Sequence, residues 1–265
     1  MTSYQNILTE VDHGVGIITL NRPERHNVID GLFISELTAA LASMSGDSSV
    51  CVIILSSLGT SFCAGVDAQW LLQGALKGEA ESLVEARAFA TLLRTLSDAP
   101  KPTVARIQGP VLGGGIGLIA ACDIAIATFD AEFALTDTQR GLIPGVIAPY
   151  VTSAIGVRHA RRYMLTAERF SASEAYRLGL VHEIVADTTG LDHALADLVD
   201  ALLANGPHAL TECKATLAVL QNRPVSAELL DHMAQRSARV RAGTEAREGL
   251  TALLEKRLPN WASKP

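Results

Sequence analysis

The sequence has little cysteine, and its histidines show no metal-binding pattern. The 265 residues include four cysteines, none of them in a C-x-x-C pair. These cysteines lie far apart in apolar surroundings, so we expect buried, reduced thiols and a cytoplasmic protein. The spacings His-x-x-x-His and His-Glu-x-x-His, which are typical of zinc sites, do not occur. We therefore expect neither disulfides nor a metal site.

The sequence also lacks a block of positive charge and a long apolar run. It has 22 basic and 28 acidic residues, which argues against a nucleic-acid partner. The first residues lack the basic and apolar regions of a signal peptide, so we expect none. Residues 111–128 are the most apolar stretch, but they contain four glycines and Asp123. We therefore expect no membrane partner.

Strand and helix patterns alternate through the first two thirds of the chain. Residues 7–11 and 15–20 predict two strands joined by a turn at His13 and Gly14. Asp30 is the predicted N-cap of a helix. Continuous apolar runs predict three buried strands, and helices are expected between them. The strands are at 50–55, 103–107 and 124–127, and the helices at 30–41, 70–96 and 113–121. This alternation predicts an α/β fold with a mainly parallel sheet.

The last third of the chain is predicted to be mainly helical. Only residues 180–185 look extended there. The predicted helices are at 173–178, 191–204, 207–220 and 227–254.

Small residues gather in three segments, 59–67, 101–117 and 133–145. The triple glycine at 113–115 opens a predicted helix, where free N–H groups and the positive end of the helix dipole suit a developing oxyanion. Close helix–sheet packing is the simpler interpretation of a triple glycine alone. A dinucleotide fingerprint at 115–120 is disfavoured, because residues 108–112 separate the preceding strand from the glycines.

Several short motifs, in order, resemble those of the crotonase (enoyl-CoA hydratase/isomerase) family. They include Phe-Cys-Ala-Gly-Val-Asp at 62–67, the triple glycine, and Gly-Leu-Ile-Pro-Gly at 141–145. Further matches lie at 21–27, 101–109, 122–124, 175–185 and 255–259. The resemblance implies a β-β-α spiral core over residues 1–195 and a helical trimerisation region over 196–265. It also implies an acyl-CoA partner, no separate cofactor, and a homotrimer or homohexamer.

The resemblance also implies roles for individual residues. The N–H groups of Val66 and Gly114 would form an oxyanion hole for a thioester carbonyl. Asp67 is a candidate for the same site, although capping of a helix or loop is the favoured interpretation. For Arg22 and Arg25 two interpretations are equally favoured: they bind CoA phosphates, or they lie in a solvated loop. The full set expected around the substrate is Arg22, Arg25, Ala64, Gly65, Asp67, Gly113 and Gly117.

Two carboxylates usually carry out the chemistry in family hydratases, and this sequence departs from the pattern at both positions. The first position holds Gly117, which has no side chain. The second holds Asp137, which is one methylene shorter than glutamate. Asp137 is therefore the expected acid–base residue. What orients water is left open between an unidentified neighbouring side chain and the substrate's own carboxylate. In the second case Gly117 would also leave room for a substituent at C3.

Residues 150–151, 160–163 and 165–170 resemble the branch that hydrates 3-substituted glutaconyl-CoA thioesters in leucine and acyclic-terpene breakdown. A hydratase of such a substrate is therefore the first hypothesis. An enoyl-CoA isomerase, which needs only one acid–base group, is the second. A non-catalytic acyl-CoA-binding scaffold is the third, and the acid kept at Asp137 argues against it.

Overall fold

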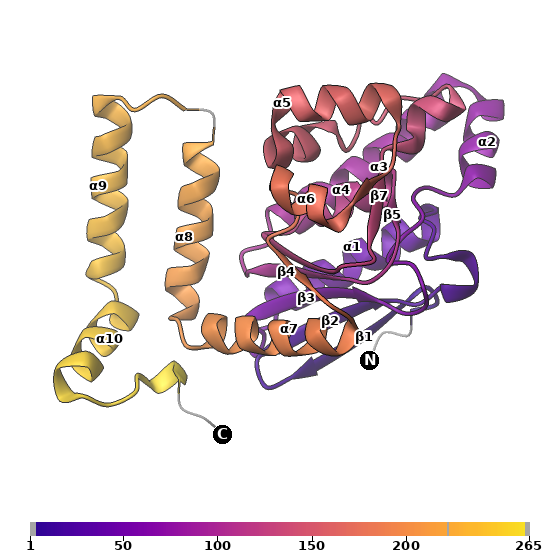
Figure 1. Cartoon of the computed structure of the whole chain (residues 1–265). Helices are drawn as coiled ribbons and strands as arrows, with labels where there is room; N and C mark the ends of the chain where they lie inside the picture. Colours follow the sequence, from indigo (N-terminus) through magenta and orange to yellow (C-terminus); the bar gives the residue numbers. More distant parts are fainter. Residues whose placement is uncertain (1–3, 222, 263–265) are drawn as a thin grey trace.

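The computed structural model describes residues 4–221 and 223–262, and its main element is a six-stranded sheet (Figure 1). The first two strands pair antiparallel as a hairpin, and every later pairing in this sheet is parallel. This confirms the predicted α/β class and the hairpin at its start. In spatial order the strands are β1 (Ile7–Asp12), β2 (Val15–Leu20), β3 (Val52–Ser57), β4 (Thr103–Ile107), β6 (Ile124–Thr128) and β9 (Glu183–Val185).

A second, three-stranded sheet holds the strand directly before the triple-glycine motif and two strands that follow it. It consists of β5 (Val111–Leu112), β7 (Glu132–Ala134) and β8 (Phe170–Ser171). The Gly113 N–H donates to the Ala134 carbonyl at 2.8 Å, so the end of β5 is fixed beside the end of β7. This contact brings the start of the next helix close to the segment that carries Asp137.

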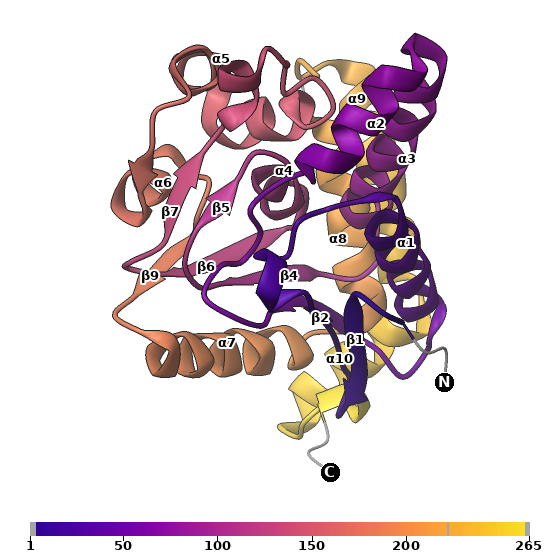
Figure 2. The same cartoon turned by 90° about the vertical axis from the view of Figure 1, so that its right-hand side faces the viewer.

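The helices of the core pack around these sheets (Figure 2). Asp30 accepts a hydrogen bond from the Phe33 N–H, which confirms the predicted N-cap. The helix expected over 70–96 is two helices, because Gly78 has a φ of 101° and interrupts the helical backbone. The core helices are α1 (Gly31–Gly46), α2 (Ala68–Lys77), α3 (Glu79–Ser97), α4 (Gly114–Ala121), α5 (Ala148–Thr166), α6 (Ala172–Leu178) and α7 (Thr188–Leu203).

The last three helices form an arm that projects to one side of the core (Figure 1). The arm consists of α8 (Pro207–Leu220), α9 (Ala227–Arg241) and α10 (Thr244–Glu255). The predicted helix 227–254 is interrupted between α9 and α10. The expected boundary between residues 195 and 196 falls inside α7, so the change from core to arm comes after that helix. Among the described residues, none of the helices is both long enough and apolar enough to cross a bilayer.

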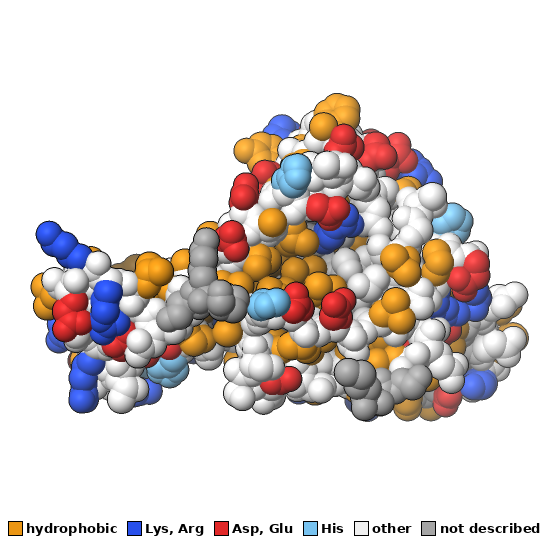
Figure 3. Space-filling view, turned by 90° about the horizontal axis from the view of Figure 1, so that it is seen from below, with side chains coloured by type: hydrophobic (Ala, Val, Ile, Leu, Met, Phe, Trp, Pro, Cys, Tyr) orange, Lys and Arg blue, Asp and Glu red, His pale blue; other side chains and the backbone are white. Residues whose placement is uncertain are grey.

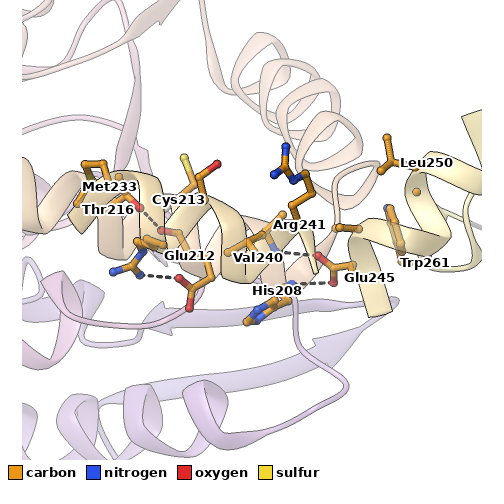
Figure 4. Close-up of a pocket in the computed structure, with 16 residues that line it drawn as sticks. His208, Glu212, Cys213, Thr216, Met233, Val240, Arg241, Glu245, Leu250 and Trp261 are labelled. Carbon is orange, nitrogen blue, oxygen red and sulfur yellow. Dashed lines mark hydrogen bonds and ion pairs between the residues drawn. The ribbon is translucent and has the colours of Figure 1, made fainter. Parts of the chain in front are cut away.

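A cavity of about 640 Å³ lies between the helices of the arm (Figure 4). Beside it, the Glu245 carboxylate accepts hydrogen bonds from the N–H groups of His208 and Ala209, at 2.9 and 2.8 Å. These are two of the N–H groups that a helix start leaves unpaired, so α10 caps the start of α8. The arm is thus held together by a contact between its own helices.

Candidate active site

Two loops meet at the start of α4. The backbone of Gly65 comes so close to the second loop that a Cβ on it would lie 2.9 Å from the Leu112 carbonyl oxygen and 3.5 Å from the Gly114 nitrogen. Gly65 also has a φ of 93°, a conformation that residues with a side chain rarely adopt. Val66 follows directly, and its Cγ2 would be 2.9 Å from a Cβ on Gly114. The Val66 and Gly114 backbones are therefore neighbours.

The N–H groups of Val66 and Gly114 are both free to bind a ligand. Val66 faces Ile29 in an isolated bridge, but the hydrogen bonds of that bridge run through Gly65 and Asp67. Gly114 is the first residue of α4. Within residues 4–221 and 223–262, neither N–H donates a hydrogen bond to another residue. Two free donors beside a helix start suit a developing negative oxygen, and their role as an oxyanion hole stays a prediction.

Asp137 lies next to these donors, in the 3-10 turn η2 (Thr136–Arg140). Its Oδ2 lies 3.6 Å from the position that a Cβ on Gly113 would take. That oxygen is buried and has no hydrogen-bond partner among the described residues. Burial raises the pKa of the Asp137 carboxyl, while its own backbone N–H and the charge of Arg140 oppose the rise. A carboxyl with a raised pKa beside free donors suits proton transfer, and the acid–base role of Asp137 stays a prediction.

The donors and Asp137 open onto a cavity of about 490 Å³. Its walls come from α2, α3, the start of α4 and the segment before α5, which lie together in the upper half of Figure 2. Most of the lining is apolar, and the charged residues in it are Glu85, Asp137 and Arg140. Such a mixture of an apolar wall and a few charged groups is typical of a small-molecule site.

The room expected beside Gly117 is filled. A Cβ on Gly117 would lie 2.3 Å from the Ile147 Cγ2 and 3.5 Å from the Leu93 Cδ1. Ile147 is 3% exposed and lines the cavity, whereas Gly117 does not. An isoleucine side chain therefore occupies the space into which a carboxylate at position 117 would extend, and the expected space for a substrate branch is absent there. A direct contact of Gly117 with substrate stays a prediction.

Arg22 is engaged inside the protein. Its Nη1 pairs with the Asp30 carboxylate at 2.6 Å and also donates to the Val28 carbonyl at 3.2 Å. The Arg22 side chain is only 10% exposed. The expectation that it reaches a CoA phosphate is therefore not supported by its position, because leaving Asp30 would break a buried ion pair.

Asp67 caps α2, as the favoured interpretation expected. Its Oδ1 accepts hydrogen bonds from the N–H groups of Gln69 and Trp70, at 2.8 and 3.1 Å. Its other oxygen pairs with Arg25, whose side chain is 44% exposed. Phosphate binding by Arg25 stays a prediction, as do the substrate contacts of Ala64, Gly65 and Gly113.

Of the lining residues that were not identified from the sequence, three bear on the chemistry: Glu85, Arg140 and Ile147. Glu85 lies four residues before the buried Phe89 on a predicted helix, so the two share a face. The four-residue spacing from Phe89 could have indicated that Glu85 points toward the interior. Nothing in the sequence signalled that Ile147 packs on Gly117.

The comparison with known families agrees with this geometry. The model of the family described as "Enoyl-CoA hydratase/isomerase" matches residues 10–264. The chain belongs to this family.

The names of individual relatives include both of the activities in that description. The chain is 34% identical to a probable enoyl-CoA hydratase of Rhodobacter capsulatus, over 99% of this chain and 100% of the relative. It is 30% identical to the peroxisomal Delta(3,5)-Delta(2,4)-dienoyl-CoA isomerase of Arabidopsis thaliana, with 99% of each chain covered. Among solved structures, an enoyl-CoA hydratase from Shewanella pealeana has a TM-score of 0.94 and 40% identity, covering 97% of this chain and 96% of that one. The relatives therefore support an acyl-CoA enzyme without choosing between hydration and isomerisation.

Gly114→Pro tests the oxyanion donor. Proline is tolerated at the first position of a helix but has no N–H. Loss of one such donor typically lowers kcat by roughly 10²–10³-fold. Gly114→Ala is the matched control, because it adds a Cβ beside Val66 but keeps the N–H. We expect Gly114→Pro to lose far more kcat per folded molecule than Gly114→Ala. Equal losses would show that crowding, and not the donor, matters.

Asp137→Asn tests the proton carrier. General acid–base catalysis supplies about 10²–10⁴-fold, so kcat should fall by that factor. The raised pKa of Asp137 means that the fold favours its protonated form, and this contribution to stability is lost as pH rises through that pKa. At neutral pH the free energy of unfolding of Asp137→Asn should therefore equal or exceed that of the wild type. A clear loss of stability with an unchanged kcat would instead assign Asp137 a structural role.

Proposed function

We propose that the protein hydrates a branched enoyl-CoA thioester that carries a second, free carboxylate. The observation that carries the proposal is the arrangement around Asp137. One half-buried acid, with a buried and unpaired oxygen, lies beside two free N–H donors, and Arg140 lines the same cavity. Asp137 and the donors suit a thioester enolate, and the guanidinium suits an anionic group on the acyl chain.

The chemistry follows from the order of these groups. The Val66 and Gly114 N–H groups would hold the thioester oxygen and stabilise negative charge as it develops there. A water oxygen bonds to C3 as the water gives up one proton to a base, the double-bond electrons form the enolate, and the Asp137 carboxyl delivers a proton to C2. Because its pKa is raised, Asp137 keeps its proton to a higher pH than an exposed aspartate does. CoA is part of the substrate, and the proposal requires no separate cofactor.

The position of Arg140 is an argument for a substrate that carries a free carboxylate. Its Nη1 donates to the Thr136 Oγ1 at 3.0 Å, and that oxygen lies 3.5 Å from the position of a Cβ on Gly113. The guanidinium is therefore anchored near the oxyanion donors. Within the described part of the chain it forms no ion pair with a carboxylate. Arginine binds carboxylates through paired donors, so a glutaconyl-type substrate would supply the missing partner.

The apolar walls of the cavity are an argument for a substrate with an apolar substituent at C3. Phe89, Val146 and Ile147 line the cavity, and none of them offers a hydrogen bond from its side chain. A 3-methyl group or a longer 3-alkenyl group fits this chemistry, in agreement with the resemblance to the glutaconyl-CoA hydratase branch.

Isomerisation is a second candidate, because moving a double bond requires only one acid–base group, and Asp137 is the one acid left at the two family positions. Candidate thioesters incubated with the protein would be followed by mass spectrometry and chromatography. Hydration adds the mass of water, whereas isomerisation changes retention at constant mass. Unchanged thioesters would support the non-catalytic scaffold.

We also propose that the arm carries the subunit contacts of a homotrimer or homohexamer. This proposal is supported by the large apolar side chains that are exposed on the arm, which projects from the core. Figure 3 shows hydrophobic side chains gathered on the face where the arm meets the core. Exposed patches of this kind typically mark protein interfaces. The exposed leucines include Leu217, Leu230, Leu250, Leu253 and Leu254.

The substrate class is tested by comparing two thioesters. We expect kcat/KM for 3-methylglutaconyl-CoA, or for a longer 3-alkenyl homologue, to be far higher than for crotonyl-CoA. Crotonyl-CoA lacks both the branch and the carboxylate. Equal values, or a preference for crotonyl-CoA, would contradict the proposed substrate.

Arg140→Gln tests how that substrate is recognised. A hydrogen bond to a charged group contributes about 1.5–3 kcal/mol, so kcat/KM for the carboxylated thioester should fall roughly 10–100-fold. Crotonyl-CoA should be affected much less. Arg87→Gln removes an exposed arginine of α3 outside the cavity lining and is the matched control. If Arg140→Gln slows both thioesters equally, Arg140 acts through Asp137 and not on the substrate.

A further inference from the structure

Hydration needs a group that orients and deprotonates water, and position 117 cannot supply it. Ile147 fills the space beside Gly117, so no side chain from α4 reaches the cavity there. If Arg140 holds the substrate carboxylate, that carboxylate is also engaged. The cavity has one further carboxylate besides Asp137 among its lining residues, namely Glu85 of α3.

The register of α3 against α4 places Glu85 one helical turn before the residue that packs on Gly114, in the same cavity as the oxyanion donors. The tip of the Phe89 ring lies 3.3 Å from the position of a Cβ on Gly114, and Leu93 lies 3.5 Å from that on Gly117. Phe89 thus packs on the first turn of α4, and Leu93 packs one turn further along the same helix. Glu85 is on the same face of α3, one turn before Phe89, or about 6 Å along the helix axis. It therefore lies beyond the start of α4, where the cavity opens.

The surroundings of Glu85 are built around its carboxylate. A Cβ on Gly74 would lie 2.1 Å from the Glu85 Oε2, so α2 has a glycine in its interior at the point where this oxygen rests. Glycine is unfavourable inside a helix, and here the missing side chain makes room for the carboxylate. Glu85 is partly buried, and among the described residues nothing forms a hydrogen bond or ion pair with it.

We propose that Glu85 is the base that activates water in place of the carboxylate absent at position 117. This inference rests on the proposed hydration. Glu85 removes one proton from the water molecule as the water oxygen bonds to C3. The C2–C3 double-bond electrons form the enolate, and Asp137 delivers its proton to C2. The product has gained one water, Glu85 is left protonated and Asp137 ionised, and solvent returns both to their starting states.

The two acids therefore have separable tasks, which two assays distinguish. The first assay is kcat for hydration of 3-methylglutaconyl-CoA. The second is exchange of the C2 protons of the saturated analogue 3-methylglutaryl-CoA in D₂O, followed by mass spectrometry. Exchange requires the oxyanion donors and Asp137 but no water addition. Glu85→Gln keeps the size of the side chain and removes the base.

We expect Glu85→Gln to lower hydration by about 10²–10⁴-fold while leaving C2 exchange within a few-fold of the wild type. Glu81→Gln is the matched control. Glu81 lies one turn earlier on α3, where its carboxylate pairs with Lys77 outside the cavity lining. This control should hydrate at the wild-type rate.

Each other outcome overturns the inference. Unchanged hydration in Glu85→Gln shows that the base lies elsewhere, while the proposed function stands. An equal loss of hydration and exchange assigns Glu85 to the shape of the cavity and not to water. A wild-type protein that exchanges C2 protons but does not hydrate the thioester overturns the proposed function, and the role of Glu85 with it.

Discussion

The close approach of two loops at Gly65 is the constraint on which the site depends. A side chain at this position would meet the Leu112 carbonyl oxygen at 2.9 Å, so the loops touch only because residue 65 is glycine. Their contact sets the Val66 N–H beside the start of α4. The hydrogen bond from Gly113 to Ala134 then brings the turn that carries Asp137 to the same place. Backbone contacts therefore assemble the site, and they determine where the side chain of Asp137 lies.

The same burial that organises the site also determines its chemistry. An apolar wall strengthens the interaction of N–H donors with a developing charge, because little water competes. It also raises the pKa of Asp137, which keeps the acid protonated to a higher pH at a cost in stability once it ionises. Arg140 moderates this effect and brings a positive charge near the donors. The acid and the positive charge thus lie in one region of the cavity.

Much of the fold follows from local patterns, but the lining of the cavity does not. Apolar runs located the long strands, whereas β5, β7 and β8 have only two or three residues each, too few to show a period. The break at Gly78 depends on a single positive φ inside a helical pattern. Family motifs located Val66, Gly114 and Asp137. The packing of Ile147 on Gly117, and the register that brings Glu85 to the cavity, depend on contacts between distant segments and became visible only in the folded chain.

The central claim is that the Val66 and Gly114 N–H groups polarise a thioester carbonyl. A saturated acyl-CoA labelled with ¹³C at that carbonyl reports on this directly by NMR. Two hydrogen bonds in a water-poor site withdraw electron density from the carbonyl carbon. The bound resonance should therefore lie downfield of that of the free thioester in water. A ligand that binds with its carbonyl resonance unmoved, or moved upfield, would contradict an oxyanion hole at this position.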